Sequence, residues 1–141
     1  MPNFVEKLQV LLESRKIFKN WQIFPKIYFK LSKKEFSIFE TKSGMKIMIR
    51  TDSTDLMALT NVWMINEYNI DDYGITENDT VIDIGAHIGL FSLRVSNFCT
   101  KGKIFSYEPI KDNFECLISN LKLNQLEHVL PFNLAVSSDS S

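Results

Sequence analysis

The sequence predicts an α/β fold in which a short parallel sheet has helices between its strands. An apolar run opens the stretch 80–95, and it is followed by a turn with two glycines and by a helical pattern. A second short strand at 103–107 precedes a helical pattern at 111–124, and a third strand follows at 128–134. Strands that alternate with helical patterns are typical of βαβ units, whose strands are parallel.

The first of these strands is expected to be buried on both faces of the sheet. Val81, Ile82 and Ile84 form an apolar run without clean alternation, which is the pattern of a central parallel strand. Asp83 interrupts this run. A carboxylate near the end of a buried strand is costly unless it accepts hydrogen bonds, so the sequence predicts a donor beside Asp83.

The turn after this strand has the features of a ligand-binding turn. Gly85 and Gly89 tolerate positive φ and place no Cβ between the backbone and a ligand. The following helix directs its electropositive end toward the same place. Glu108 closes the second strand, where an acid is well placed to accept both hydroxyls of a ribose. The sequence therefore predicts an adenosine-containing cofactor.

The third strand is expected at an edge of the sheet. Pro131 lies near its middle and cannot donate a ladder hydrogen bond. The helix before it should turn Phe114, Leu117, Ile118 and Leu121 inward. Asn113 and Asn120 are expected to cap or brace loops rather than act in catalysis.

Two motifs resemble those of class I S-adenosylmethionine-dependent methyltransferases, namely Asp83-Ile-Gly-Ala-His-Ile-Gly89 and Tyr107-Glu-Pro109. Further residues make residues 36–141 similar to the FkbM-type methyltransferases, which are mostly O-methyltransferases of hydroxyls on glycans and natural products. These residues are Asn113, Phe114, Leu117, Asn120, Asn124 and the segment Asn133-Leu-Ala135. His87 departs from that family, which usually has Asn at this position.

The resemblance implies a cofactor site for S-adenosyl-L-methionine, without a metal. Backbone amides around Gly85 and Ala86 would face the amino-acid end of the cofactor, and Asp83 would orient the turn or meet the ammonium group of the cofactor through water. Glu108 would bind the ribose, and Asn133 and Ala135 would line the adenine side. The full set of cofactor-binding residues is expected to be Asp83, Gly85, Ala86, His87, Gly89, Glu108, Pro109, Asn133 and Ala135.

The acceptor implied by the resemblance is a small-molecule or glycan hydroxyl. Asp55 and the pair Glu67-Tyr68 match residues that recur beside the cofactor pocket in that family. The sequence identifies no catalytic base, so a non-catalytic cofactor-binding or interaction module stays open as a second interpretation. A nicotinamide-dependent oxidoreductase is disfavoured because its fingerprint needs Gly at His87 and Leu90.

The fold class expected from the resemblance is the first half of a Rossmann-like class I methyltransferase sheet, with strand order 3-2-1 and an apparent truncation. The chain is then either a fragment of a longer protein, or the free edge of the first strand is covered. The cover would be the N-terminal hairpin or another chain, so a homodimer through the exposed sheet edge is possible.

Residues 1–75 are expected to form an N-terminal helix, a β-hairpin and a helical cap, and residues 76–141 the cofactor-binding half-domain. Helical spacing of Phe4, Leu8, Leu11, Leu12 and Arg15 predicts an amphipathic packing helix at 3–18, followed by irregular chain at 20–34. A hairpin is expected at 36–50 around Gly44. A helix should then run from 55 to about 67 with Trp63 in the core.

Composition narrows the function classes further. The chain has 141 residues, of which 45% are hydrophobic, so it can bury the core of one domain. Its net charge of -1 offers no basic field and disfavours a nucleic-acid partner. Charged residues interrupt the apolar N-terminus, so no membrane span is expected and a cytoplasmic location follows. Cys99 and Cys116 are expected to be buried free thiols.

Overall fold

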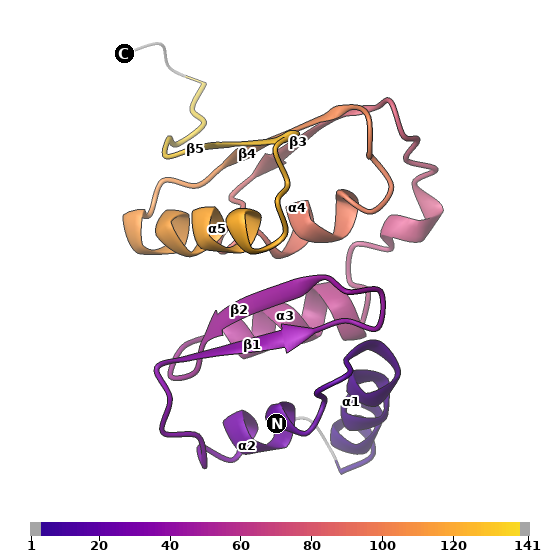
Figure 1. The fold of residues 1–141 in the computed structure, drawn as a ribbon, viewed down its shortest axis with the longest axis vertical. Coiled ribbons are helices and arrows are strands. Elements are labelled where there is room, and N and C mark those ends of the chain that lie inside the picture. The colour runs from indigo at the N-terminus through magenta and orange to yellow at the C-terminus, as the bar shows by residue number, and fades with distance from the viewer. Residues whose placement is uncertain (1–3, 139–141) are drawn as a thin grey trace. The chain divides into compact units, whose positions relative to one another are not determined.

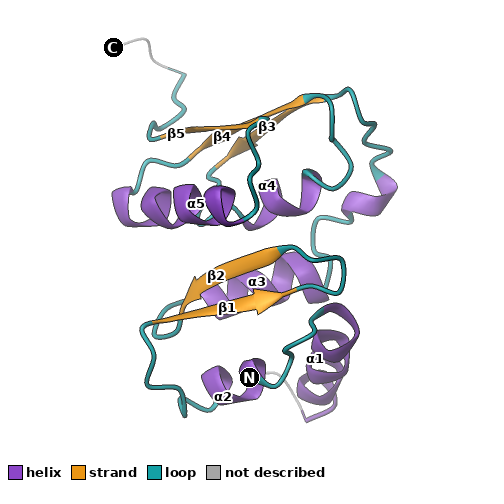
Figure 2. Ribbon diagram, in the orientation of Figure 1, coloured by secondary structure: helices purple, strands orange, loops and turns teal. Residues whose placement is uncertain are grey.

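The computed structural model describes residues 4–138 and divides the chain into two compact units, residues 1–68 and 69–141 (Figure 1). The first unit contains α1 (Phe4–Ile17), α2 (Ile23–Tyr28), β1 (Phe36–Glu40), β2 (Lys46–Arg50) and α3 (Asp55–Leu59). A π-helical turn, Thr60–Met64, continues α3. The helices and strands of each unit are distinguished by colour in Figure 2.

The hairpin of the first unit confirms the expected β1-β2 pair. The strands are antiparallel, with Phe36 opposite Arg50 and Glu40 opposite Lys46. Gly44 has a φ of 98° in the connecting loop, a conformation that glycine adopts without a Cβ clash. Burial alternates along both strands, and Phe39 and Ile47 enter the core of the unit. This alternation is what a hairpin with one covered face requires.

Trp63 is buried, as expected, but the helical segment ends at Met64 rather than near residue 67. Helix α1 spans 4–17, close to the expected 3–18; Asn3 lies outside the described residues. Of the apolar residues at helical spacing, Leu8 and Leu12 are exposed and Leu11 is half-buried. Directly after the helix, Phe18 bridges to Thr41 of the hairpin and is fully buried.

The segment 20–34, expected to be irregular, contains helix α2. Phe24 and Ile27 are buried and anchor this short helix in the unit. Pro25 lies in its first turn, where the missing N–H has no helical partner to lose. Burial of two apolar side chains therefore outweighs the weak helical pattern.

The second unit contains β3 (Thr80–Ile84), α4 (Leu90–Val95), β4 (Lys103–Tyr107), α5 (Lys111–Leu123) and β5 (Val129–Phe132), after a 3-10 turn at Ile70–Asp72. Its sheet is parallel with β4 between β3 and β5, which confirms the predicted Rossmann-like α/β class and strand order. Pro131 lies in β5 at an edge of this sheet, as expected.

The two faces of this sheet differ. Figure 1 shows α4 and α5 on the same side, where Leu93, Ile104 and Leu117 are fully buried. On the other face, Ile82 is 62% exposed and Ile84 is 64% exposed. The expectation that β3 is buried on both faces is therefore wrong within the described residues, because both helices cover one face and side chains alternate along a strand.

The remaining composition-based expectations concern cysteines and membrane spans. Cys99 and Cys116 are free and buried, which confirms the prediction. Among residues 4–138, no helix is both long enough and apolar enough to cross a membrane.

Candidate functional site

The turn after β3 holds three positive φ angles within five residues: 77° at Gly85, 54° at His87 and 88° at Gly89. The carbonyl oxygen of Tyr107 accepts the N–H groups of both Gly85 and Ala86, each at 2.9 Å. Pairing with β4 thus extends beyond the last residue of β3. Both amides are therefore already bonded to the neighbouring strand, and a contact between the cofactor and the backbone around Gly85 and Ala86 stays a prediction.

The two glycines of the turn have different surroundings. A Cβ on Gly89 would lie 2.5 Å from the Cδ1 atom of Leu117, so this glycine lets the turn approach α5. A Cβ on Gly85 would meet no atom within 4 Å. Gly89 therefore serves packing, whereas Gly85 leaves open space at the carboxyl end of β3, where ligands bind in such sheets.

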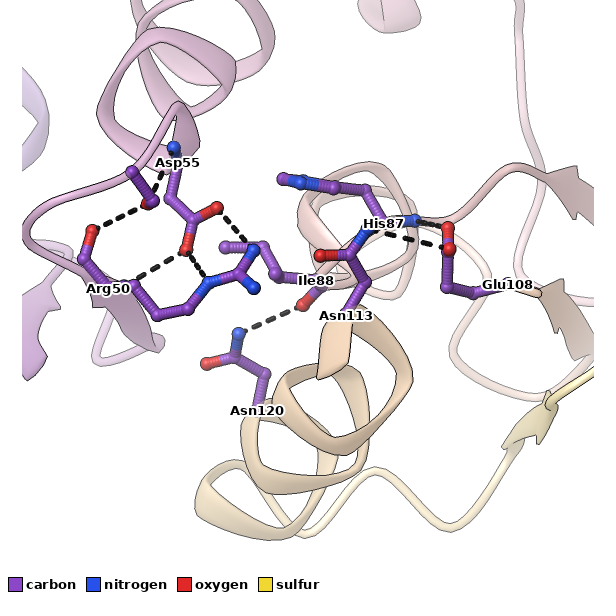
Figure 3. A network of polar contacts seen from close by, with 8 residues as sticks. Arg50, Asp55, His87, Ile88, Glu108, Asn113 and Asn120 are labelled. Atoms are coloured by element: carbon purple, nitrogen blue, oxygen red, sulfur yellow. Dashed lines mark hydrogen bonds and ion pairs between the residues drawn. The ribbon is translucent and has the colours of Figure 1, made fainter. Parts of the chain in front are cut away.

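Glu108 joins the turn to the end of β4 (Figure 3). Its Oε2 atom accepts the backbone N–H of His87 at 2.7 Å, and its Oε1 atom accepts that of Ile110 at 2.9 Å. Asn113 Nδ2 lies 3.5 Å from Oε1, and the Glu108 residue is buried. A carboxylate has about four acceptor positions, so two backbone bonds leave capacity for hydroxyl donors. The acid and the turn lie together, as the sequence predicts.

The donor expected beside Asp83 is Ser92 on α4. Ser92 Oγ donates to Asp83 Oδ2 at 2.6 Å and lies 2.6 Å from the Oγ atom of Ser106, which pairs with Asp83 across the β3-β4 ladder. Burial raises the pKa of the Asp83 carboxyl, the Ser92 hydrogen bonds oppose this rise, and the charge of Glu108 adds to it. The sequence analysis missed both serines, although small polar residues at inward positions were the available signal.

Two asparagines brace the backbone around this site. Asn120, fully buried on α5, donates to the Ile88 carbonyl at 2.9 Å, as its predicted bracing role requires (Figure 3). Asn133 donates to the carbonyls of Glu108 at 2.8 Å and Pro109 at 3.1 Å. Asn133 thus reaches the end of β4.

The other predicted site residues have less specific surroundings. Pro109 and Ala135 are exposed, and Ala135 lies in the coil after β5. The half-buried His87 contributes its backbone N–H to Glu108. Hydrogen bonds therefore bring the turn residues, Glu108 and Asn133 together at the carboxyl end of the sheet.

In the first unit, the buried Asp55 pairs with the half-buried Arg50. The Asp55 Oδ2 atom accepts the Arg50 backbone N–H and Nε–H, each at 2.9 Å, and Oδ1 accepts from an Nη atom at 2.8 Å (Figure 3). Two-pronged bonding of this kind orients both groups and joins the end of β2 to the start of α3. A role beside the cofactor for Asp55, Glu67 or Tyr68 stays a prediction.

Comparison with known families matches residues 40–140 to the TRM5/TYW2 methyltransferase domain. This region includes the Asp83 motif, Glu108 and Asn133. No curated protein matches the chain. The predicted class I methyltransferase relationship is thereby supported, while the narrower FkbM-type family is not the one that matches.

Solved structures share the fold. TYW2 of M. jannaschii in complex with AdoMet is 23% identical, with a TM-score of 0.57 over 74% of this chain and 45% of that chain. TYW2 of P. horikoshii in complex with MeSAdo is 17% identical, with a TM-score of 0.52 over 72% and 36%. The M. jannaschii tRNA m1G37 methyltransferase is 21% identical, with a TM-score of 0.52 over 74% and 31%. The chain thus spans less than half the length of these structures.

The prediction of a hydroxyl acceptor without a nucleic-acid partner is contradicted, because the solved neighbours include a tRNA m1G37 methyltransferase. The net charge of the whole chain was a misleading guide, because it averages two units of opposite charge. Residues 1–68 carry 11 Lys and Arg against 7 Asp and Glu, a net charge of +4. Residues 69–141 carry 5 against 10, a net charge of -5.

The site residues and the family match coincide in the sequence. The match extends over more than half of the chain, and it contains both strand ends from which the site is built. The chain belongs to the TRM5/TYW2 methyltransferase domain family.

Proposed function

We propose that this chain is the S-adenosylmethionine-binding part of a methyltransferase whose acceptor is RNA. The family match supports methyl transfer, and the solved neighbours include a tRNA m1G37 methyltransferase and complexes with AdoMet, MeSAdo and adenosine. The observation that carries the proposal is the bonding of Glu108 to the turn after β3, which brings an acid with a spare acceptor position beside the open space at Gly85.

The residues of the site fit such a cofactor in charge and in shape. Besides its two backbone bonds and the longer bond from Asn113, Glu108 keeps about one further acceptor position for a ribose hydroxyl while it holds the turn. Gly85 permits close approach because a Cβ there would meet only open space. Asp83 and Glu108 also make the strand ends acidic, which suits a cationic ligand. The cofactor supplies an electrophilic methyl group on a positively charged sulfur.

The direct test is a calorimetric titration of the chain with S-adenosylmethionine and S-adenosylhomocysteine. Glu108→Ala should weaken binding by roughly tenfold to a hundredfold, since hydrogen bonds to a charged group are lost. Glu108→Gln keeps one carbonyl oxygen acceptor and should weaken it less. Glu127→Ala removes an exposed acid and serves as the control.

Circular dichroism must first show that the variants are folded, because Glu108 also bonds to the backbone. Parent-like affinity in both Glu108 variants would reject the proposed ribose contact. Failure of the parent chain to bind either ligand would reject the cofactor site altogether.

A second candidate is a non-catalytic cofactor-binding module. It would use the same acid and turn, because binding a cofactor needs no further group than these. The two candidates differ in whether the protein transfers a methyl group from the bound cofactor. A cytoplasmic location and a homodimer through the free edge of β3 stay predictions.

Membership in the narrower FkbM-type group is also only a proposal. It is supported by the residues after Glu108, including Pro109, Asn113 and Asn120. The glycan or natural-product hydroxyl associated with that group is not part of the proposed function.

A further inference from the structure

A surface in the first unit lies outside the residues that match the family. Residues 26–34, here called the lysine-aromatic segment, precede the matched region that begins at residue 40. The segment contains four lysines, two aromatic residues and no acid: Lys26, Tyr28, Phe29, Lys30, Lys33 and Lys34 carry these groups. It belongs to the unit with a net charge of +4, and the cofactor site uses none of these residues.

Backbone hydrogen bonds give this segment a defined shape. Lys30 ends α2 with a φ of 55°, its N–H donates to Ile27 O at 2.9 Å, and the Leu31 N–H donates to Lys26 O at 2.8 Å. This pair of bonds is a Schellman motif, which closes the helix and reverses the chain. At the other end, Thr51 Oγ1 donates to the Lys34 carbonyl. The segment is therefore held at both ends.

The aromatic rings are supported from the core. The buried Phe24 ring stacks with Tyr28, with centroids 6.2 Å apart and planes at 15°. The Phe29 ring lies edge-on to Tyr28 at 5.1 Å and 87°. Phe29 is nevertheless 66% exposed and Tyr28 is 42% exposed. These contacts orient large rings that remain accessible, which is the property of a stacking platform for bases.

The positive charge of the segment is poorly compensated. Within the described part of the chain, no carboxylate forms an ion pair with the exposed ammonium groups of Lys26, Lys33 or Lys34. Lys30 Nζ lies 3.9 Å from Asp52 Oδ1, and both side chains are almost fully exposed. Such a pair contributes little, because water screens it. Four ammonium groups therefore remain available for phosphates.

We propose that the lysine-aromatic segment binds single-stranded nucleic acid. Bases would stack on Phe29 and Tyr28, while the lysines contact phosphates, a combination that binds single strands with little sequence preference. The rival partner is an anionic membrane, since lysines beside exposed apolar side chains also suit a lipid surface. Rings held in contact with one another favour base stacking, because their positions are set before binding.

The salt dependence of binding tests the phosphate contacts. Anisotropy of a fluorescent single-stranded oligouridylate is measured with the full chain, without cofactor, at several salt concentrations. Replacing Lys26, Lys33 and Lys34 together by Gln should lower the slope of log affinity against log salt by about 2, at about 0.7 per contact. The same replacement at Lys103, Lys111 and Lys122, exposed lysines of the second unit, should leave the slope nearly unchanged.

Substitution of exposed apolar residues separates the two partners. Phe29→Ala should weaken oligouridylate binding about tenfold at an unchanged salt slope, because a stacking surface is lost. Phe29→Trp should restore it. Leu31→Ala, at a residue that is 71% exposed, should leave oligonucleotide affinity unchanged but would weaken insertion into a lipid surface. All of these side chains are exposed, so their replacement should not unfold the unit.

Co-sedimentation with phosphatidylcholine-phosphatidylserine vesicles completes the test. The proposal is overturned if neither the triple lysine replacement nor Phe29→Ala changes the affinity of the chain for the oligonucleotide. It is also overturned if the chain does not bind the oligonucleotide but binds the vesicles, and if this vesicle binding is lost in Leu31→Ala. Cofactor titration of the same variants should match the parent, so failure here leaves the cofactor site to be judged separately.

Discussion

At the scale of single residues, Ser92 supplies a hydrogen bond to the Asp83 carboxylate, which is buried near the end of β3. Its hydroxyl donates to Asp83 and meets Ser106, so the three side chains form one buried polar cluster under the turn. Burial still raises the pKa of Asp83, which means that desolvation outweighs the two Ser92 hydrogen bonds. The charged form of Asp83 therefore costs stability in the folded state.

This cost should appear as a pH dependence of stability. Because burial raises the folded pKa of Asp83 above its unfolded value, its stabilising contribution is complete below the unfolded pKa. That contribution is lost as pH rises through the folded pKa. Asp83→Asn has no such loss, so its free energy of unfolding relative to the parent should increase across this window and then level off.

Denaturant unfolding at a series of pH values measures the difference between the two chains. Asp112→Asn, at an exposed acid of α5, should show no comparable trend. A difference for Asp83→Asn that stays constant with pH, or decreases, would contradict the burial argument.

At the scale of elements, the two glycines of the turn after β3 have different roles. Gly89 must be small because Leu117 of α5 lies against it, whereas Gly85 borders open space. Both have positive φ, so backbone strain alone cannot distinguish them. Gly44 in the hairpin provides the comparison, since it also has positive φ and no atom within 4 Å of an added Cβ.

Gly85→Val should reduce affinity for S-adenosylmethionine by more than about tenfold, because a branched side chain would occupy the space beside the strand end. Gly44→Val introduces similar backbone strain far along the sequence and should leave the affinity close to that of the parent. Calorimetric titration of both variants, after thermal unfolding shows comparable loss of stability, makes the comparison. Equal affinities for the two variants would assign Gly85 a purely conformational role.

At the scale of the whole molecule, one face of the β3-β4-β5 sheet carries exposed apolar side chains within the described residues. Ile82 and Ile84 stand on this face, and Tyr107 and Phe132 stack beside them with centroids 5.0 Å apart. The chain also spans less than half of the solved neighbours described above.

We expect the chain to bind the cofactor without turnover, because the residues described for the site include no base and no acceptor-positioning wall. Lost positioning alone can remove on the order of 7 kcal/mol of barrier reduction. The measurement is transfer of labelled methyl from S-adenosylmethionine to unmodified tRNA. Robust transfer that depends on the tRNA would refute this expectation and establish the chain as a complete enzyme.

The features that the sequence predicted correctly are those written in local patterns. The strand, turn and helix around Gly85 and Gly89, the acid at the end of β4, the hairpin at Gly44 and helix α5 each follow from neighbouring residues. Pro131 marked an edge strand for the same reason, since a missing N–H excludes a central position. Periodicity and turn chemistry act over a few residues, so they can be read without the fold.

Other features were decided only by the tertiary structure, because they depend on contacts between segments distant in the sequence. The sheet is covered by helices on one face, Tyr107 takes the amides of Gly85 and Ala86, and Ser92 is the partner of Asp83. The bridge between Phe18 and Thr41, which joins the end of α1 to the hairpin, also links segments distant in the sequence. The partition of charge between the two units became visible only when the unit boundary was known, since opposite charges cancel in the total.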